Sequence, residues 1–282
     1  NKYMSNCFIL LAAGKSKRFK SNTLKQFINY KNKPLFMHSI DKVIKSNLFN
    51  QIVLVTNNKI KLKNKKIKII KGGRERYNSS QKALDYIKNK SFKNVFIHDA
   101  ARPNFSISLL KNLLKYLKKN NAVVPYTNTD NSTKYSYQNK IINLERDRVL
   151  LTQTPQCFDF KTLYNLSKNN KTPVTDESSL FLNNNKKVKF IKGEETNIKI
   201  TKKSDLNTFP IKTFYGIGFD IHRLIKNKKL YLGGIKIPFH SGLKGHSDGD
   251  VIVHSIIDAI LGSLRKKDIG TLYPSNKINL KI

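Results

Sequence analysis

A short apolar run that leads directly into small residues constrains the fold of this chain more than any other feature. Residues 8–11 read Phe-Ile-Leu-Leu, and Ala12, Ala13 and Gly14 follow at once. The run predicts a buried strand of a parallel sheet, and the small residues let backbone N–H groups approach a ligand closely. Lysine or arginine occupies positions 15, 17, 18, 20 and 25, so a polyanion is the expected ligand. An ATPase P-loop is excluded, because Ile9 stands where that loop requires its first glycine.

Strand and helix patterns alternate after this loop. Pro34 and the apolar spacing behind it predict a helix, and two more helices are expected at 79–90 and 109–117. Apolar runs predict strands at 51–57, 67–70, 94–98 and 122–125, and helix-like and strand-like patterns resume as far as residue 201. We therefore predict an α/β fold whose doubly wound, mostly parallel sheet carries helices on both faces.

A change in the pattern of apolar and polar residues at 134–142 predicts an arm-like hairpin. Tyrosines alternate with polar residues there, and Gln138-Asn139 separates them from Ile141 and Ile142. The hairpin either pairs with a second subunit or remains an ordinary surface hairpin.

Length and composition divide the chain in two. A chain of 282 residues is long for one domain, Phe209-Pro210 resembles a linker, and four of the six histidines lie beyond Phe214. We predict domains at 1–211 and 212–282, the second an incomplete α+β domain.

The net charge of +36 raises the possibility of a nucleic-acid-binding protein. The lysines are spread along the whole chain, however, and no RNP-like strand, paired-cysteine finger or basic zipper accompanies them. We therefore expect no nucleic-acid partner. Two cysteines without a CxxC spacing and no apolar span of membrane length favour a cytoplasmic protein with no membrane contact.

Polar residues at strand ends form the first candidate site, because ligands of open parallel sheets bind beyond the carboxyl ends of the strands. Asp99 directly follows an apolar strand, where its carboxylate suits Mg²⁺. The alternative is a helix cap.

Seven motifs occur here in a fixed order: LLAAGKSKR, LKQ, GGRERYNSS, HDAARP, TPQ, TDE and NIKIT. Together they resemble the 2-C-methyl-D-erythritol 4-phosphate cytidylyltransferase family over about residues 6–210. The resemblance implies a nucleotidyltransferase-like fold that transfers CMP from CTP to methylerythritol phosphate. It implies that cytidine is held by Ala12, Ala13, Gly14, Gly73 and Ser79. Arg18 and Lys25 are then expected to neutralise the triphosphate and Asp99 to hold Mg²⁺, while Arg102, Arg146, Lys199 and Ser132 or Thr133 grip or orient the second substrate.

Three positions depart from that family's pattern. Leu24 replaces a usual proline, Arg74 replaces a small or acidic residue near the cytosine, and NTDNSTK is an imperfect form of a DTxK motif around Ser132.

Histidines and carboxylates form a second candidate site. Asp220 and His222 lie two apart, which on a strand places both side chains on one face, and Asp250 and His254 lie four apart on an expected helix. Two imidazoles and one carboxylate with an open position are typical of a zinc site.

GIGFDIHR, LGGIKIP, GLKGHSDGDVIVHSIIDAILG and DIGTLYP resemble the start of the 2-C-methyl-D-erythritol 2,4-cyclodiphosphate synthase family. The resemblance implies zinc ligands at Asp220, His222 and His254, phosphate contacts from His246 and Ser247, and an approach to the ribose by residues from Asp268 to Gly270. It implies a homo-oligomer that catalyses two non-consecutive steps of non-mevalonate isoprenoid synthesis. The alternative is a transferase with a non-catalytic assembly module. The similarity stops near Ile282, and because all the zinc-site positions are intact and the N-terminus also looks clipped, we expect a fragment of a longer protein rather than a decayed fusion.

Overall fold

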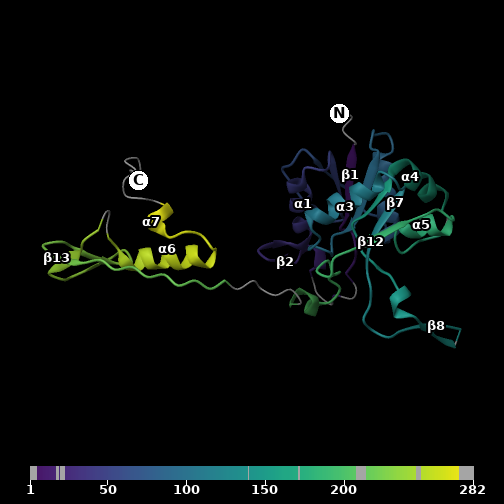
Figure 1. Cartoon of the computed structure of the whole chain (residues 1–282). Coiled ribbons are helices and arrows are strands. Elements are labelled where there is room, and N and C mark those ends of the chain that lie inside the picture. Colours follow the sequence, from purple (N-terminus) through teal and green to yellow (C-terminus); the bar gives the residue numbers. More distant parts are fainter. Residues whose placement is uncertain are drawn as a thin grey trace. The chain divides into compact units, whose positions relative to one another are not determined.

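The computed structural model describes residues 5–16, 19, 23–138, 140–170, 172–207, 214–245 and 249–272. It divides into two compact units, Asn1–Phe209 and Pro210–Ile282, which we call unit 1 and unit 2 (Figure 1). The predicted boundary between residues 211 and 212 falls in a segment outside the described residues and stays a prediction.

Unit 1 is built on a mixed sheet with the predicted first strand near its centre. That strand, β1 (Asn6–Leu11), pairs in parallel with both β4 (Gln51–Val55) and β6 (Asn94–Asp99). The strand order is β10-β7-β11-β6-β1-β4-β5, and β12 also pairs with β7. The remaining strands are β5 (Ile67–Ile70), β7 (Ala122–Thr127), β10 (Leu151–Thr152), β11 (Gln156–Asp159) and β12 (Lys189–Lys192). Every antiparallel pair of this sheet includes β10 or β11 and the other pairs are parallel, so the prediction of a mostly parallel sheet is confirmed.

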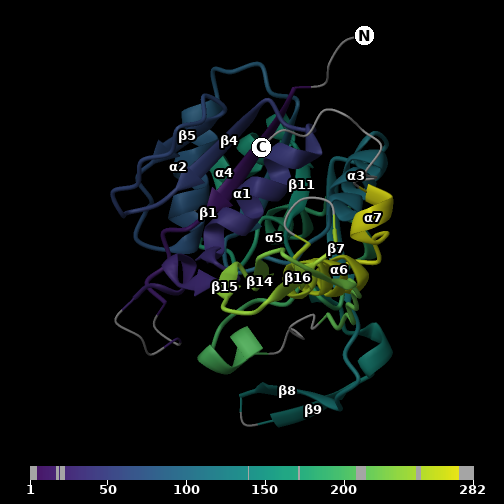
Figure 2. The same ribbon diagram turned by 90° about the vertical axis from the view of Figure 1, so that its left-hand side faces the viewer.

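Helices cover both faces of this sheet, as predicted (Figures 1 and 2). Phe8 and Leu10 point to a core shared with α1 (Leu35–Ser46) and α3 (Ile107–Leu117). Cys7 and Ile9 point the other way, to α2 (Arg76–Ile87), α4 (Phe160–Asn169) and α5 (Ser178–Asn183). Alternate residues of β1 therefore belong to two cores, which is why its sequence is apolar from Cys7 to Leu11.

Two local predictions need correction. Helix α2 begins at Arg76 and not at Ser79, because Glu75 and Asn78 exchange side-chain and backbone hydrogen bonds in a capping box. Residues 197–201 form no helix or strand, although Asn197 and Ile200 are fully buried.

The predicted hairpin arm is confirmed. Strands β8 (Thr133–Tyr137) and β9 (Lys140–Leu144) pair only with each other and project from the body of unit 1 (Figures 1 and 2). Five short elements complete unit 1: η2 (Lys25–Phe27), β2 (Asn29–Tyr30), β3 (Lys33–Pro34), η3 (Arg146–Arg148) and η4 (Lys203–Asn207).

Unit 2 combines two strand pairs with a long helix. Strand β13 (Leu224–Lys226) pairs with β16 (Ser241–Leu243), and β14 (Leu230–Leu232) pairs with β15 (Ile235–Ile237). Helix α6 (Val251–Ser263) is followed by α7 (Ile269–Leu272). No helix in the described ranges of either unit is long and apolar enough to cross a membrane.

The extended segment 214–223 lies along α6 instead of in a sheet. A Cβ atom added to Gly216 would lie 2.7 Å from the backbone nitrogen of Ser263, and one added to Gly218 would lie 2.5 Å from that of Ala259. Residues 220–222 belong to no strand in the described structure, so the strand expected around Asp220 and His222 is wrong; one face of this extended segment packs directly on the backbone of α6.

Candidate functional sites

A cavity of about 280 Å³ opens at the carboxyl ends of β1 and β6, where the sheet geometry predicts a ligand site. Its lining brings together seven of the predicted residues: Ala12, Ala13, Gly14, Lys25, Ser79, Asp99 and Lys199. Gln26, Arg74 and Arg76 also line it. Arg18 lies outside the described residues. Gly73 lies beside the lining, where its N–H donates to Ser79 Oγ (3.0 Å).

Gln26 holds the glycine loop after β1 in place. Its buried amide donates to the carbonyl oxygens of Ala12 (2.8 Å) and Gly14 (3.0 Å), and its Oε1 accepts from the hydroxyl of Ser16 (3.1 Å). The Lys25 N–H donates to the same hydroxyl. These bonds fix the loop beside Lys25 even though Leu24 replaces the family's proline. Sequence reasoning missed Gln26, although its place in the LKQ motif was a signal.

Asp99 is held between two cations. Arg76 Nε donates to Oδ1 (2.9 Å), and Lys199 Nζ donates to Oδ2 (2.6 Å). Burial alone would raise the pKa of Asp99, but these two cations hold it well below its ordinary value. The helix-cap alternative is wrong, because Ser106 caps the next helix, α3.

Arg76 also binds a second buried carboxylate. Its Nη1 and Nη2 donate to both oxygens of Glu177 at 2.9–3.1 Å, in the bidentate geometry that guanidinium favours. Burial by itself would lower the pKa of Arg76, but the carboxylates of Asp99 and Glu177 raise it above its ordinary value. No local sequence pattern predicts this pair, which joins residues 101 positions apart.

His98 shapes the turn that carries Asp99. Its Nε2 lies 3.0 Å from the Arg102 carbonyl oxygen, which can only accept, so Nε2 donates and Nδ1 accepts from the Thr154 hydroxyl (3.0 Å). The same hydroxyl oxygen accepts from the Asp99 N–H (3.1 Å). Complete burial lowers the pKa of His98 to about 3, so the imidazole stays neutral.

Arg102 points to backbone carbonyls in this structure. Its guanidinium donates to the oxygens of Asn197 (2.6 Å) and Thr152 (3.3 Å), and its buried Nε finds no partner in the part of the chain that the structure describes. Lys25 Nζ donates to the Ile200 oxygen (3.0 Å). The segment 197–200 is thus attached to two of the cationic residues predicted for the site.

Ser132 and Arg146 are not brought to this cavity. Both are exposed at or near the arm, and Arg146 lies 3.7 Å from Asp147. Thr133, the other candidate hydroxyl, begins β8.

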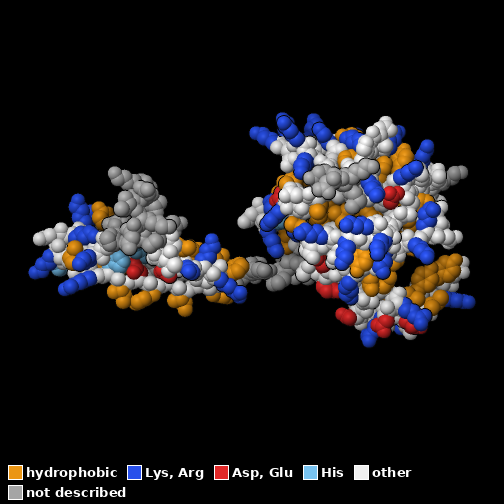
Figure 3. All heavy atoms as spheres, turned by 45° about the horizontal axis from the view of Figure 1, so that its top comes forward, with side chains coloured by type: hydrophobic (Ala, Val, Ile, Leu, Met, Phe, Trp, Pro, Cys, Tyr) orange, Lys and Arg blue, Asp and Glu red, His pale blue; other side chains and the backbone are white. Residues whose placement is uncertain are grey.

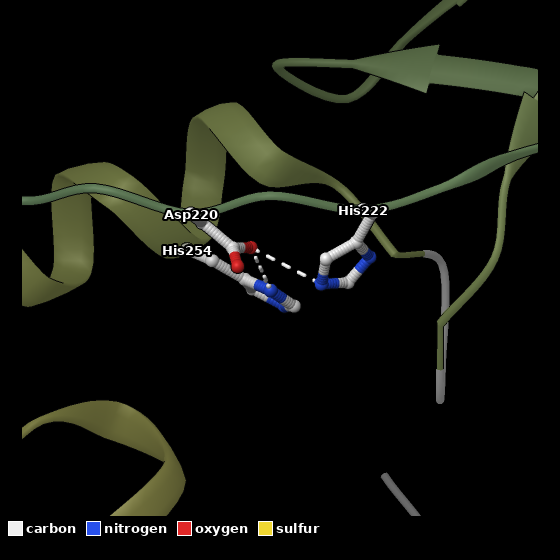
Figure 4. Close-up of side chains that lie close together, drawn as sticks. All are labelled: Asp220, His222 and His254. Carbon is white, nitrogen blue, oxygen red and sulfur yellow. Dashed lines mark hydrogen bonds and ion pairs between the residues drawn. The ribbon is translucent and has the colours of Figure 1, made fainter.

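The second site lies in unit 2, where Asp220, His222 and His254 converge (Figure 4). Asp220 Oδ2 is 3.0 Å from His254 Nδ1 and 3.2 Å from His222 Nε2, and one ligand atom of each residue lies within 4.8 Å of the others. The buried Nδ1 of His222 has no hydrogen-bond partner among the described residues. Nε2 of His222 and Nδ1 of His254, both directed at one carboxylate oxygen of Asp220, fit a divalent cation.

Asp250 positions His254 without joining this cluster. Its buried carboxylate accepts from the N–H groups of Gly233, Gly234, Ile252 and Val253 at 2.7–3.2 Å. It therefore caps α6 and attaches the β14–β15 turn to the helix that carries His254.

The structure describes only some of the other residues predicted for the site in unit 2. His246 and Ser247 lie outside the described residues. Asp268 accepts from the N–H and hydroxyl of Thr271 (2.8 Å each), and Gly270 is exposed.

Comparison with known proteins shows which families the two parts of the chain match. Residues 6–210 match the family model described as IspD, 2-C-methyl-D-erythritol 4-phosphate cytidylyltransferase, and residues 213–281 match that of the YgbB family. A bifunctional enzyme IspD/IspF of Pelagibacter ubique is 50% identical over 99% of this chain and 76% of its own length. The chain belongs to the bifunctional IspD/IspF family. The resemblance of both parts to these enzymes is confirmed.

Solved structures agree with this family. The bifunctional IspDF of Campylobacter jejuni superposes with a TM-score of 0.65 at 35% identity, over 98% of this chain and 74% of that one. The IspD of Francisella tularensis gives a TM-score of 0.64 at 29% identity, over 72% of this chain and 97% of its own. The predicted nucleotidyltransferase-like fold is confirmed for unit 1.

Proposed function

We propose that unit 1 transfers CMP from CTP to 2-C-methyl-D-erythritol 4-phosphate and releases pyrophosphate. One observation carries this proposal: Lys25, Lys199 and Asp99, which are far apart in the sequence, line one cavity beside the small-residue loop. Ala12, Ala13, Gly14, Gly73 and Ser79 are proposed to hold cytidine, and Arg18 to join Lys25 at the triphosphate.

The reaction needs fixed positive charge more than a nucleophilic side chain. A phosphate oxygen of the acceptor attacks the α-phosphorus of CTP, and the bond to the pyrophosphate oxygen breaks. Lys25 and Lys199 are placed to stabilise the charge that gathers on the phosphoryl and leaving oxygens. The neutral His98 and the hydroxyl of Thr154 orient the Asp99 turn without exchanging protons with substrate.

Mg²⁺ is the proposed divalent metal of this site, with Asp99 as its protein ligand. Both carboxylate oxygens already accept from cations, so the ion would share the carboxylate with Arg76 and Lys199 and take its remaining ligands from phosphates and water. When bound, the metal offsets phosphate charge.

The test is the variant Lys199→Ala, with Lys111→Ala on the exposed side of α3 as the control. We expect pyrophosphate release to fall by about 10²–10³-fold in the first and to stay unchanged in the second. Near-normal release from folded Lys199→Ala would refute the assignment.

We further propose that unit 1 is a homo-oligomer joined through the arm. Its apolar side chains are unusually exposed, from 37% for Leu144 to 74% for Ile141. Figure 3 shows apolar side chains gathered on that projecting part, whereas lysine and arginine are scattered over the rest of the face in view. A second copy's arm would bring Arg146 and Ser132 or Thr133 to the cavity, as Arg102 is proposed to approach it from within.

For unit 2 we propose cyclisation of 4-diphosphocytidyl-2-C-methyl-D-erythritol 2-phosphate with release of CMP. Asp220, His222 and His254 would hold Zn²⁺, which when bound orients phosphate and offsets its charge. His246 and Ser247 are proposed phosphate contacts, and the residues from Asp268 to Gly270 are proposed to approach the ribose. Zinc-free purified protein would instead favour a module that serves only for assembly.

A cytoplasmic location is proposed on one observation. Cys7 and Cys157 are both buried free thiols, which fits a reducing compartment.

A further inference from the structure

Glu177 is a buried carboxylate that no substrate role explains. It precedes α5 and is 1% exposed, and it lies behind Arg76, away from the described lining of the transferase cavity. A buried charge of this kind is costly unless it is paired, and its pairing to Arg76 is bidentate. Its effect on the cavity must therefore pass through Arg76.

Arg76 is committed to two carboxylates. It makes four hydrogen bonds, one to Asp99 and three to Glu177, from a group that has five N–H donors. Little donor capacity remains for a phosphate. Arg76 lines the cavity, but its guanidinium is held by the carboxylates of Asp99 and Glu177.

The result is a row of four alternating charges: Glu177, Arg76, Asp99 and Lys199. The contacts along it measure 2.9, 2.9 and 2.6 Å. Its members come from the residue before α5, from α2, from the end of β6 and from the segment 197–200, so each element fixes the next.

Lys199 is the residue of this row whose side-chain position depends most on its neighbours. Its side chain is 36% exposed, and a lysine that reaches into a solvated cavity has many rotamers to lose. Asp99 Oδ2 restrains the ammonium group, and Asp99 is itself restrained through Oδ1 by Arg76.

We propose that Glu177 and Arg76 are positioning residues of the transferase site, which hold the Asp99 carboxylate so that it directs Lys199 into the cavity. The inference rests on the proposed function of unit 1. Preorganised charge acts on the transition state, so loss of the row lowers kcat more than it weakens binding of CTP.

The test uses Glu177→Gln, which keeps the shape of the side chain and removes its charge. We expect kcat to fall about tenfold or more, while the calorimetric Kd for CTP changes less than about threefold. Glu177→Asp keeps the charge and should restore part of the rate. The control, Asp41→Asn, removes the exposed ion pair with Lys33 and should leave both values unchanged.

A double variant shows whether the effect passes through Lys199. If it does, adding Glu177→Gln to Lys199→Ala costs no further rate, whereas a full additional loss overturns the proposal. A purely structural role predicts that kcat per folded molecule, with the folded fraction taken from circular dichroism, stays within twofold of wild type, and this result also overturns it.

The outcomes separate the two proposals. Wild-type protein that releases no pyrophosphate from CTP and methylerythritol phosphate refutes the proposed function, whereas an active wild type with an equally active Glu177→Gln variant refutes only the positioning role. If Glu177→Gln fails to fold, Arg76→Lys, which keeps the positive charge but cannot bind both carboxylates as the guanidinium does, carries the same test, and an unchanged kcat in that variant overturns the inference.

Discussion

Replacing Gly218 with alanine should weaken the proposed metal site of unit 2 without changing a ligand. The added Cβ would lie 2.5 Å from the backbone nitrogen of Ala259 and 2.8 Å from the carbonyl carbon of Ser255. Ordinary contacts of this kind are about 3.5 Å or longer, so the segment 214–223 must move away from α6 by about 1 Å. Helix backbone cannot yield as a side chain would.

That movement separates the proposed ligands. Asp220 lies two residues beyond Gly218, and its Oδ2 is 3.0 Å from Nδ1 of His254 on α6. Metal–ligand distances tolerate deviations of only about 0.2 Å. We therefore expect zinc affinity to fall by at least about tenfold, the smallest loss common when groups that orient ligands are altered.

The assay is a zinc titration of the purified protein against a chromophoric chelator, with zinc content measured by mass spectrometry. Gly262→Ala is the matched control, because it makes the same change in α6 and its Cβ would meet only the Ile217 oxygen, at 3.7 Å. Circular dichroism verifies that both variants fold. Wild-type zinc affinity in folded Gly218→Ala would refute the reasoning.

Three further predictions concern unit 1. Ile141→Asp on the arm should convert an oligomer to monomers in sedimentation velocity, because it places charge on the most exposed apolar side chain of the hairpin; an unchanged sedimentation coefficient would count against the arm. Gln26→Ala should weaken CTP binding by about tenfold in calorimetry, since it removes three loop hydrogen bonds, and an unchanged Kd would contradict that role. Cys7 and Cys157 should resist iodoacetamide at pH 8 until denaturant is added. Burial raises the pKa of Cys7 to about 12, which leaves a thiolate fraction of about 10⁻⁴; rapid labelling of native protein would refute this.

Local sequence patterns were enough to predict the central strand of unit 1 and the ligand loop that follows it. The apolar run at 8–11 and the small residues behind it specify a buried strand and a ligand loop, and the carboxyl ends of parallel strands place Asp99 beside that loop at one edge of the sheet. These inferences use only periodicity and general sheet geometry, which is why they hold.

The partners of those residues could not be predicted. An aspartate at a strand end does not reveal its counter-ions, and the Arg76–Glu177 pair depends on how α2 and α5 pack on the same face. Nor could local pattern separate Asp250, which caps a helix, from Asp220, which faces two histidines.

The incorrect strand at 220–222 has a general cause. Side chains two apart share a face on any extended backbone, whether or not a neighbouring strand pairs with it. The pattern correctly predicted that Asp220 and His222 lie together, and it could not tell that glycines at 216 and 218 place the segment against a helix.

The hydrogen bond from Lys25 Nζ to the Ile200 oxygen spans 175 positions of the sequence, almost the whole length of unit 1. During synthesis the amino-terminal loop leaves the ribosome early, whereas Lys199 leaves it last of the residues that line the cavity. The lining of the cavity, which includes both Lys25 and Lys199, is therefore complete only when nearly all of unit 1 has been synthesised. A nascent chain interrupted before this segment can form β1 and its loop, but it lacks the lysine that completes the proposed chemistry.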